Sequence, residues 1–218
     1  MSIRCAIFDL DGTLVDSLHD IAAAMNDALQ INGLPVHPRA AYLHFVGEGV
    51  DVLTSRAIAP HTESFQVVLG SYRQAYAARL PGRTQPFAGI VPALDGLATA
   101  GLALAVLSNK PDAATQTLVQ QLFSPSTFAI IAGQKDQVPR KPDPTAALAI
   151  AAQLQVAPGE CAFIGDTSTD MDTAVAAGMT AVGVTWGFRS REELRNHGAQ
   201  LLIDEPSDLL PQLLALRS

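Results

Sequence analysis

From Phe87 onward the sequence alternates between apolar runs of strand length and segments with helical spacing. The expected strands cover residues 102–107, 128–132, 160–165, 180–185 and 200–203. The expected helices cover residues 90–100, 112–122, 143–155, 169–177 and 191–197, with a last helix after Pro206. Strands that alternate with helices form right-handed βαβ units. We therefore expect an α/β fold with a parallel sheet and helices on both faces.

Another apolar run, at residues 3–10, predicts the first strand, but no simple crossover helix follows it. Instead, residues 16–82 show helical spacing interrupted by Gly33, by the Gly47-Glu48-Gly49 turn and by Pro60, and carry no strand signal. We expect a small all-helical cap over residues 16–82. It would be inserted after the first strand of a Rossmann-like core made of residues 1–15 and 83–218.

The first strand runs directly into Asp9-Leu10-Asp11-Gly12-Thr13. Ligands in open α/β sheets bind just outside the carboxyl ends of the strands. Side chains alternate along a strand, so Asp9 and Asp11 should start on the same side. Two carboxylates this close repel each other unless a cation lies between them or one stays protonated. The alternative is a strand that ends in an ordinary Asp-Gly turn.

A second apolar run, at residues 160–165, also ends in acids, namely Asp166 and, four residues later, Asp170. Magnesium prefers oxygen ligands and is usually held by one or two carboxylates, waters and substrate phosphate. We expect Asp9, Asp11 and Asp166 to form such a site, with Asp170 among the metal ligands or directly behind them. The alternative for Asp166 and Asp170 is helix capping, because acids favour helix N-termini.

Two further segments carry groups that suit phosphate. The strand at residues 102–107 ends in Ser108-Asn109-Lys110-Pro111, where a hydroxyl and backbone amides can hold a phosphate oxygen. Lys141, in Arg140-Lys141-Pro142, opens a helix and can neutralise charge on a transferring phosphoryl group. Alternatively, Ser108 and Asn109 form only a helix cap, and Lys141 is a solvated surface lysine.

Taken together, these four motifs resemble those of the haloacid dehalogenase-like superfamily of phosphohydrolases, in the same order. The resemblance extends over nearly the whole chain and is strongest to the phosphoglycolate phosphatase-like branch. The stretches that carry it lie at residues 9–17, 46–53, 108–111 and 186–194.

The resemblance implies a role for each motif residue. Asp9 would be the nucleophile that forms an aspartyl-phosphate, and Asp11 the acid that protonates the leaving alcohol and then activates water. Thr13 would orient this machinery. Ser108 and the amide of Asn109 would hold the phosphoryl oxygens.

The resemblance also implies a magnesium cofactor. Asp166 would bind the ion together with Asp9 and the backbone carbonyl of Asp11, and Asp170 would support the metal from behind. Lys141 would balance the negative charge of Asp9 and of the phosphoryl group. The metal would neutralise charge and orient the group for in-line attack.

Several reactions share these motifs. The second acid, Asp11, is absent from relatives that displace halide, so dehalogenation is disfavoured. The first hypothesis is a magnesium-dependent phosphatase of a small, phosphoglycolate-like phosphomonoester. The alternatives are a β-phosphoglucomutase-like phosphosugar mutase and a non-catalytic phospholigand-binding protein of the same fold.

In the resembled family, a cap in this place selects the substrate. The core motifs handle only the phosphoryl group, so selection should come from the cap. We expect Gly47, Glu48 and Gly49 to form its contact loop. Glu48 would repel an anionic substrate unless its carboxylate turns away or pairs with a cation.

Composition limits the possible partners and location. The 218-residue chain has a net charge of −7 and no basic run, which argues against binding to nucleic acid or to anionic membranes. No apolar stretch is long enough for a transmembrane helix, and no signal peptide is visible. Cys5 and Cys161 lie in expected core strands and should be reduced. We expect a cytoplasmic monomer or homodimer that acts on a small phosphorylated metabolite.

Overall fold

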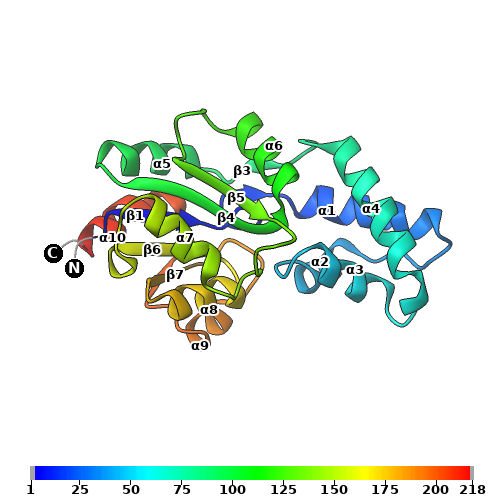
Figure 1. The fold of residues 1–218 in the computed structure, drawn as a ribbon. Coiled ribbons are helices and arrows are strands. Elements are labelled where there is room, and N and C mark those ends of the chain that lie inside the picture. Colours follow the sequence, from blue (N-terminus) through cyan, green and yellow to red (C-terminus); the bar gives the residue numbers. More distant parts are fainter. Residues whose placement is uncertain (1–2, 217–218) are drawn as a thin grey trace.

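The central sheet is parallel, as the sequence predicts. The structure, a computed structural model, describes residues 3–216. Within that range the sheet consists of β1 (Cys5–Phe8), β4 (Ala103–Pro111), β5 (Ile130–Gln134), β6 (Cys161–Gly165), β7 (Thr180–Val184) and β8 (Leu201–Ile203). Their order across the sheet is β5-β4-β1-β6-β7-β8 (Figure 1). Strand β1 therefore lies between β4 and β6, and the carboxyl ends of these three strands are neighbours.

Helices cover both faces of the sheet, which confirms the expected α/β fold. Successive side chains of a strand point to opposite faces, so Ala6 and Phe8 enter one hydrophobic cluster and Cys5 and Ile7 another. The first cluster is completed by α5 (Ile90–Thr99), α6 (Asp112–Leu122) and α10 (Leu209–Ala215). The second is completed by α7 (Thr145–Gln153), α8 (Ser168–Ala177) and α9 (Arg191–Asn196).

Four helices between β1 and α5 pack around a third hydrophobic cluster. They are α1 (Leu18–Ile31), α2 (Arg39–Phe45), α3 (Val50–Ile58) and α4 (Phe65–Arg79). Met25, Tyr42 and Leu53 are buried in this cluster, and Tyr72 and Tyr76 of α4 stack there with their ring centroids 5.6 Å apart. Figure 1 shows the four helices grouped beside the sheet, with α1 and α4 running side by side. Short 3₁₀ turns complete the chain: η1 (Thr62–Ser64), η2 (Pro158–Glu160) and η3 (Pro206–Asp208).

The chain enters and leaves the α1–α4 segment at adjacent points. Two short strands that the sequence analysis did not predict, β2 (Val15–Asp16) and β3 (Gln85–Pro86), pair there in antiparallel fashion. Beside them, Oδ2 of Asp20 accepts hydrogen bonds from the backbone N–H of Arg83 at 2.8 Å and of Thr84 at 2.7 Å. These contacts tie the start of α1 to the returning chain.

The structure corrects several predicted boundaries. Strand β4 does not end at residue 107 but continues to Pro111, with a register shift against β5. Ser108, Asn109 and Lys110 therefore lie inside a strand and not at a strand–helix junction. The first strand is shorter than the expected residues 3–10, since β1 stops at Phe8. Lys141 lies in a loop, because α7 begins only at Thr145.

Two expectations from composition can be compared with the described residues. Cys5 and Cys161 are buried free thiols at paired positions of β1 and β6. None of the helices described is both long enough and apolar enough to cross a membrane.

Candidate active site

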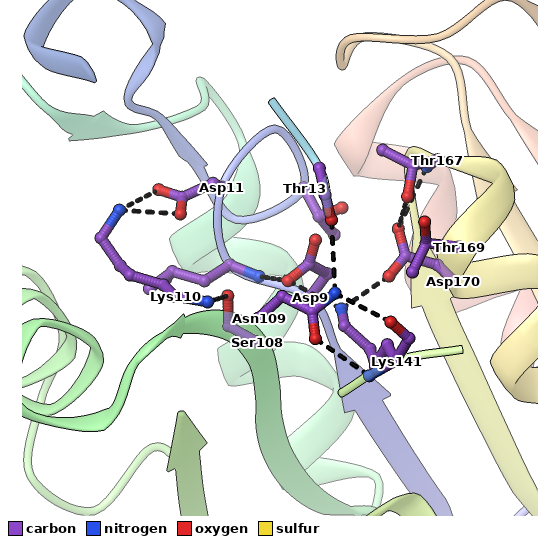
Figure 2. Close-up of polar contacts among 12 residues, drawn as sticks. Asp9, Asp11, Thr13, Ser108, Asn109, Lys110, Lys141, Thr167, Thr169 and Asp170 are labelled. Carbon is purple, nitrogen blue, oxygen red and sulfur yellow. Dashed lines mark hydrogen bonds and ion pairs between the residues drawn. The ribbon is translucent and has the colours of Figure 1, made fainter. Parts of the chain in front are cut away.

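The polar ends of β1, β4 and β6 converge at one edge of the sheet. Asp9 directly follows β1, Ser108 and Asn109 belong to the last part of β4, and Asp166 directly follows β6. Figure 2 shows Asp9 at the centre of this group, with Lys141 beneath it and Asp170 beside it. The site brings together segments more than 150 positions apart, because these strands are adjacent in the sheet.

Asp9 is buried and held through only one of its oxygens. Its Oδ1 accepts a hydrogen bond from the backbone N–H of Leu10 at 2.7 Å and lies 3.0 Å from Nζ of Lys141. Among the described residues, no hydrogen bond or ion pair engages Oδ2. Burial raises the pKa of Asp9 to about 7, the positive charge of Lys141 opposes the rise, and Asp170 and Asp11 add to it. The free Oδ2 is the atom available for attack on an electrophile.

Asp9, Asp166 and Asp170 form a buried cluster in which one carboxylate oxygen from each residue lies within 4.8 Å of the other two. Asp166 accepts hydrogen bonds from Oγ1 of Thr13 at 2.9 Å and from the backbone N–H of Phe188 at 2.8 Å. Burial, together with the charges of Asp170 and Asp9, raises the pKa of Asp166 well above its ordinary value. A divalent cation bound at these oxygens would relieve this repulsion, so the donor set fits magnesium.

Both oxygens of Asp170 already have protein partners. Oδ1 lies 2.7 Å from Nζ of Lys141, and Oδ2 accepts hydrogen bonds from the backbone N–H and the hydroxyl of Thr167 at 3.0 and 2.7 Å. The contact with Thr167 forms a capping box at the start of α8. The helix-capping alternative therefore holds for Asp170, and the residue belongs to the carboxylate cluster as well.

Two glycines leave room for the Asp166 carboxylate. A Cβ on Gly12 would lie 2.3 Å from Oδ2 of Asp166, and one on Gly187 would lie 2.3 Å from its Cβ. Gly12 also has a φ of +87°, a conformation that residues with a side chain rarely adopt. The glycine of the first motif is thus required for its backbone shape and for its close approach to Asp166.

Lys141 is a buried residue and not a solvated surface lysine. Its Nζ lies between Oδ1 of Asp9 and Oδ1 of Asp170. Burial by itself lowers the pKa of Lys141, but Asp170 and Asp9 raise it by more, so the amine stays charged. The side-chain amide of Asn109 holds the Lys141 backbone, accepting from its N–H at 3.0 Å and donating to its carbonyl at 3.1 Å.

Asp11 does not form the close carboxylate pair with Asp9 that strand alternation predicts. Its two oxygens lie 2.9 and 2.8 Å from Nζ of Lys110, and Figure 2 shows this pair pointing away from Asp9. The alternation fails because β1 ends at Phe8, so Asp11 lies beyond the strand, in an isolated bridge to Val15. The acids that cluster with Asp9 come from the end of β6 and from α8.

Lys110 is a site residue that the sequence motifs did not single out. Its side chain is only 5% exposed, and its Nζ lies 4.6 Å from the centre of the Tyr76 ring in α4. A signal was present in the sequence: the chain has three lysines, and two of them, Lys110 and Lys141, lie within the recognised motifs. A lysine at the end of an apolar strand also needs a partner, which here is Asp11.

A cavity of about 410 Å³ opens between the strand ends and helices α1, α3, α4 and α6. On the side of the sheet, the cavity is lined by Asp9, Asp11, Ser108, Asn109 and Lys110. On the other side, α1, α3, α4 and the turn before α3 contribute mostly apolar side chains and Arg73. Its volume falls in the range of small-molecule sites.

The Gly47-Glu48-Gly49 turn lies against the core with its two glycines facing the cavity. Gly49 has a φ of +90°, and a Cβ there would lie 3.3 Å from the carbonyl oxygen of Asn109. The carbonyl of Gly47 accepts a hydrogen bond from Nδ2 of Asn109 at 3.4 Å. Glu48 does not line the cavity and forms an ion pair with Arg56 of α3. This pairing removes the conflict between Glu48 and an anionic substrate.

Comparisons with known proteins agree with these observations. Residues 6–184 match the family model described as haloacid dehalogenase-like hydrolase. A phosphoglycolate phosphatase of Mesorhizobium japonicum is 34% identical over 199 residues, which cover 88% of this chain and 86% of that protein. The phosphoglycolate phosphatase of Salmonella paratyphi A is 30% identical, with 97% of this chain and 93% of that protein covered. A crystal structure from Lactobacillus delbrueckii subsp. bulgaricus superposes with a TM-score of 0.91 at 32% identity, covering 98% of this chain and 99% of that one.

Proposed function

This chain belongs to the haloacid dehalogenase-like hydrolases and is a phosphoric monoester hydrolase, and from that premise we propose that it hydrolyses a small phosphomonoester through an aspartyl-phosphate with the help of magnesium. The observation that best supports this mechanism is how the two carboxylate oxygens of Asp9 are held. One of its oxygens is held by Leu10 and Lys141, whereas no hydrogen bond or ion pair within residues 3–216 engages the other, and Asp9 lines the cavity. A carboxylate fixed in this way is suited to nucleophilic catalysis.

In the proposed reaction, Oδ2 of Asp9 attacks phosphorus, and the bond to the leaving alcohol breaks. Asp11 gives a proton to the departing oxygen and later takes one from the water that cleaves the acyl phosphate. Lys141, placed between Asp9 and Asp170, offsets the charge of the nucleophile and the phosphoryl group. Ser108 and the backbone amide of Asn109, which line the cavity beside Asp9, would bind the phosphoryl oxygens.

The proposed cofactor is Mg²⁺, held by Asp9, Asp166 and the backbone carbonyl of Asp11. Asp170 would support the metal from behind, with Oδ1 on Lys141 and Oδ2 on Thr167. Thr13 would orient Asp166 through its hydroxyl. When bound, the metal supplies charge neutralisation and fixes the orientation of the phosphoryl group.

We assign residues 16–82 the role of a cap that reads the leaving group, with Gly47 and Gly49 at the contact. Glu48 would hold the shape of this turn through Arg56. The substrate to test first is 2-phosphoglycolate, in view of the phosphoglycolate phosphatases that the chain resembles. We place the enzyme in the cytoplasm as a monomer or homodimer. Gel filtration measures its oligomeric state.

The experiment that tests the function is phosphate release from a panel of phosphorylated metabolites with added Mg²⁺. The wild-type protein should turn over at least one small phosphomonoester, and Asp9→Asn should not. A mutase would instead convert a phosphosugar only when primed with a bisphosphorylated sugar. Absence of phosphate release from every member would overturn the proposal.

A further inference from the structure

Lys110 occupies a position that the proposed chemistry does not explain. Its side chain is buried at the end of β4, and its Nζ lies 2.9 and 2.8 Å from the two oxygens of Asp11. The same Nζ lies 4.6 Å from the centre of the Tyr76 ring in α4. Both Lys110 and Asp11 line the cavity. Lys110 thus lies where β4, Asp11 and helix α4 meet, beside the part of the cavity that would hold the leaving group.

The cavity beyond the catalytic end is largely apolar, with side chains that include Ile21, Val46, Leu53 and Leu80. A charged group placed in such surroundings is unfavourable unless it is paired. Among the described residues that line the cavity, the cations are Lys110 and Arg73. Arg73 is exposed on α4, whereas Lys110 is buried beside Asp11.

Lys141 is not available to a substrate's leaving group. Its Nζ is taken up by Asp9 and Asp170 at 3.0 and 2.7 Å, and it does not line the cavity. Lys110, in contrast, has one carboxylate partner, and an ammonium group offers three donors. It can accept a second anion or exchange one anion for another.

We propose that Lys110 is the specificity-determining residue that recognises a carboxylate on the leaving group, and that this carboxylate displaces Asp11 from Lys110. The released Asp11 side chain is then free to turn toward the leaving oxygen. Phosphomonoesters without an anionic leaving group leave Asp11 in its pair with Lys110 and react more slowly. This inference rests on the proposed phosphatase function and names the substrate class: phosphorylated hydroxy acids.

The test compares 2-phosphoglycolate with 2-hydroxyethyl phosphate, in which a neutral hydroxymethyl group replaces the carboxylate. A hydrogen bond to a charged group contributes about 10- to 100-fold in such comparisons. Lys110→Met should therefore lower kcat/KM for 2-phosphoglycolate about 10- to 100-fold more than for 2-hydroxyethyl phosphate. Because both substrates are measured on one preparation, the ratio does not depend on the fraction of folded protein.

Two variants complete the design. Lys110→Arg keeps the charge and should retain most of the preference for 2-phosphoglycolate. Lys135→Met is the matched control, since the Lys135 side chain is 63% exposed, pairs with Asp112 and does not line this cavity. It should leave the ratio unchanged.

The outcomes separate the two proposals. If Lys110→Met lowers kcat/KM for both substrates by the same factor, Lys110 does not read the carboxylate. If Arg73→Gln alone removes the preference, the exposed arginine reads it, and this inference is also wrong. If the wild-type enzyme hydrolyses other phosphomonoesters but does not prefer 2-phosphoglycolate, the inference fails while the phosphatase function stands. If it hydrolyses none, the proposed function fails and the inference fails with it.

Discussion

The side chain of Asn109 holds the backbone of Lys141 on both sides, accepting from its N–H at 3.0 Å and donating to its carbonyl at 3.1 Å. Asn109 belongs to β4 and Lys141 to the loop before α7, so this contact joins the second and third motifs. It presents Nζ of Lys141 to Asp9 while the main chain of Asn109 stays beside the cavity. The same amide also reaches the carbonyl of Gly47 in the turn before α3. Asn109 thus links strand β4, the buried lysine and the turn.

Replacement of Asp9 or Asp11, the two acids of the first motif, should abolish turnover or reduce it strongly. Asp9→Asn removes the nucleophile and should leave no measurable phosphate release while the circular dichroism spectrum stays that of the wild type. Asp11→Asn removes acid–base catalysis and should slow turnover about 100- to 10,000-fold. Asp95→Asn, at an exposed position of α5, is the control. Near-wild-type hydrolysis by Asp9→Asn would exclude the proposed mechanism.

Gly12→Ala should be much more damaging than Gly33→Ala. Both glycines have a positive φ, +87° and +70°, which costs a residue with a Cβ about 1–2 kcal/mol. Only at Gly12 would the Cβ collide with Asp166, at 2.3 Å, since nothing lies within 4 Å at Gly33. We expect Gly12→Ala to lose activity and to lower the free energy of unfolding more than Gly33→Ala does. Activity is measured by phosphate release, and the free energy of unfolding by urea unfolding. Equal losses in both variants would show that the close contact between Gly12 and Asp166 is not what requires glycine.

Stability without metal should fall as the pH rises toward neutrality. An Asp in an unfolded chain has a pKa of about 3.9, whereas the pKa of Asp9 in the folded protein is raised to about 7. Between these values the folded state binds more protons than the unfolded state, so the free energy of unfolding decreases as the pH increases. The stabilisation is complete below about pH 4 and is lost as the pH passes about 7.

Thermal unfolding in EDTA from pH 4.5 to 8 measures this dependence. Asp9→Asn removes the titrating group and should flatten the curve of Tm against pH, although Asp166 continues to contribute. Asp95→Asn should follow the wild type. Curves of equal slope for the wild type and Asp9→Asn would show that Asp9 does not titrate in this range.

Magnesium should be required for activity, and calcium should inhibit. The proposed ligands are oxygens, and in-line attack needs tight geometry, whereas calcium accepts six to eight ligands in a looser arrangement. Calcium would recruit the second oxygen of Asp9 and occupy the electron pair needed for attack. Phosphate release is measured after chelation and dialysis and after return of each ion. Full activity in protein verified to be free of metal would rule the site out.

Changes in the turn before α3 should alter the ranking of substrates. Gly49→Ala introduces a Cβ 3.3 Å from the carbonyl oxygen of Asn109 at a φ of +90°, so the turn must shift. The ranking across a panel of phosphomonoesters should change much more than hydrolysis of a small aryl phosphate. Glu48→Gln weakens the pair with Arg56, which lies away from the cavity, so it should change the ranking less than the glycine variants do. An unchanged ranking in both Gly47→Ala and Gly49→Ala would remove this turn from substrate selection.

The sequence by itself determined the parallel α/β sheet, because apolar runs of strand length and helical periodicity are local patterns. The same runs placed Asp9 and Asp166 directly after strands, and β4, β1 and β6 lie next to one another in the sheet. Ser108, expected just after a strand, lies inside β4. The segments around residues 128–132 and 102–107 were less well placed. Their boundaries depend on pairing between β4 and β5, which includes a register shift.

Only the tertiary structure decided which charges meet. Lys141 is buried between Asp9 and Asp170, and Asp11 pairs with Lys110 instead of approaching Asp9. Pairings of this kind depend on where distant loops fold back over the end of the sheet and on the burial that makes an unpaired charge costly. A linear motif lists the charged residues of a site, whereas packing across some 30 to 160 positions determines the partner of each one.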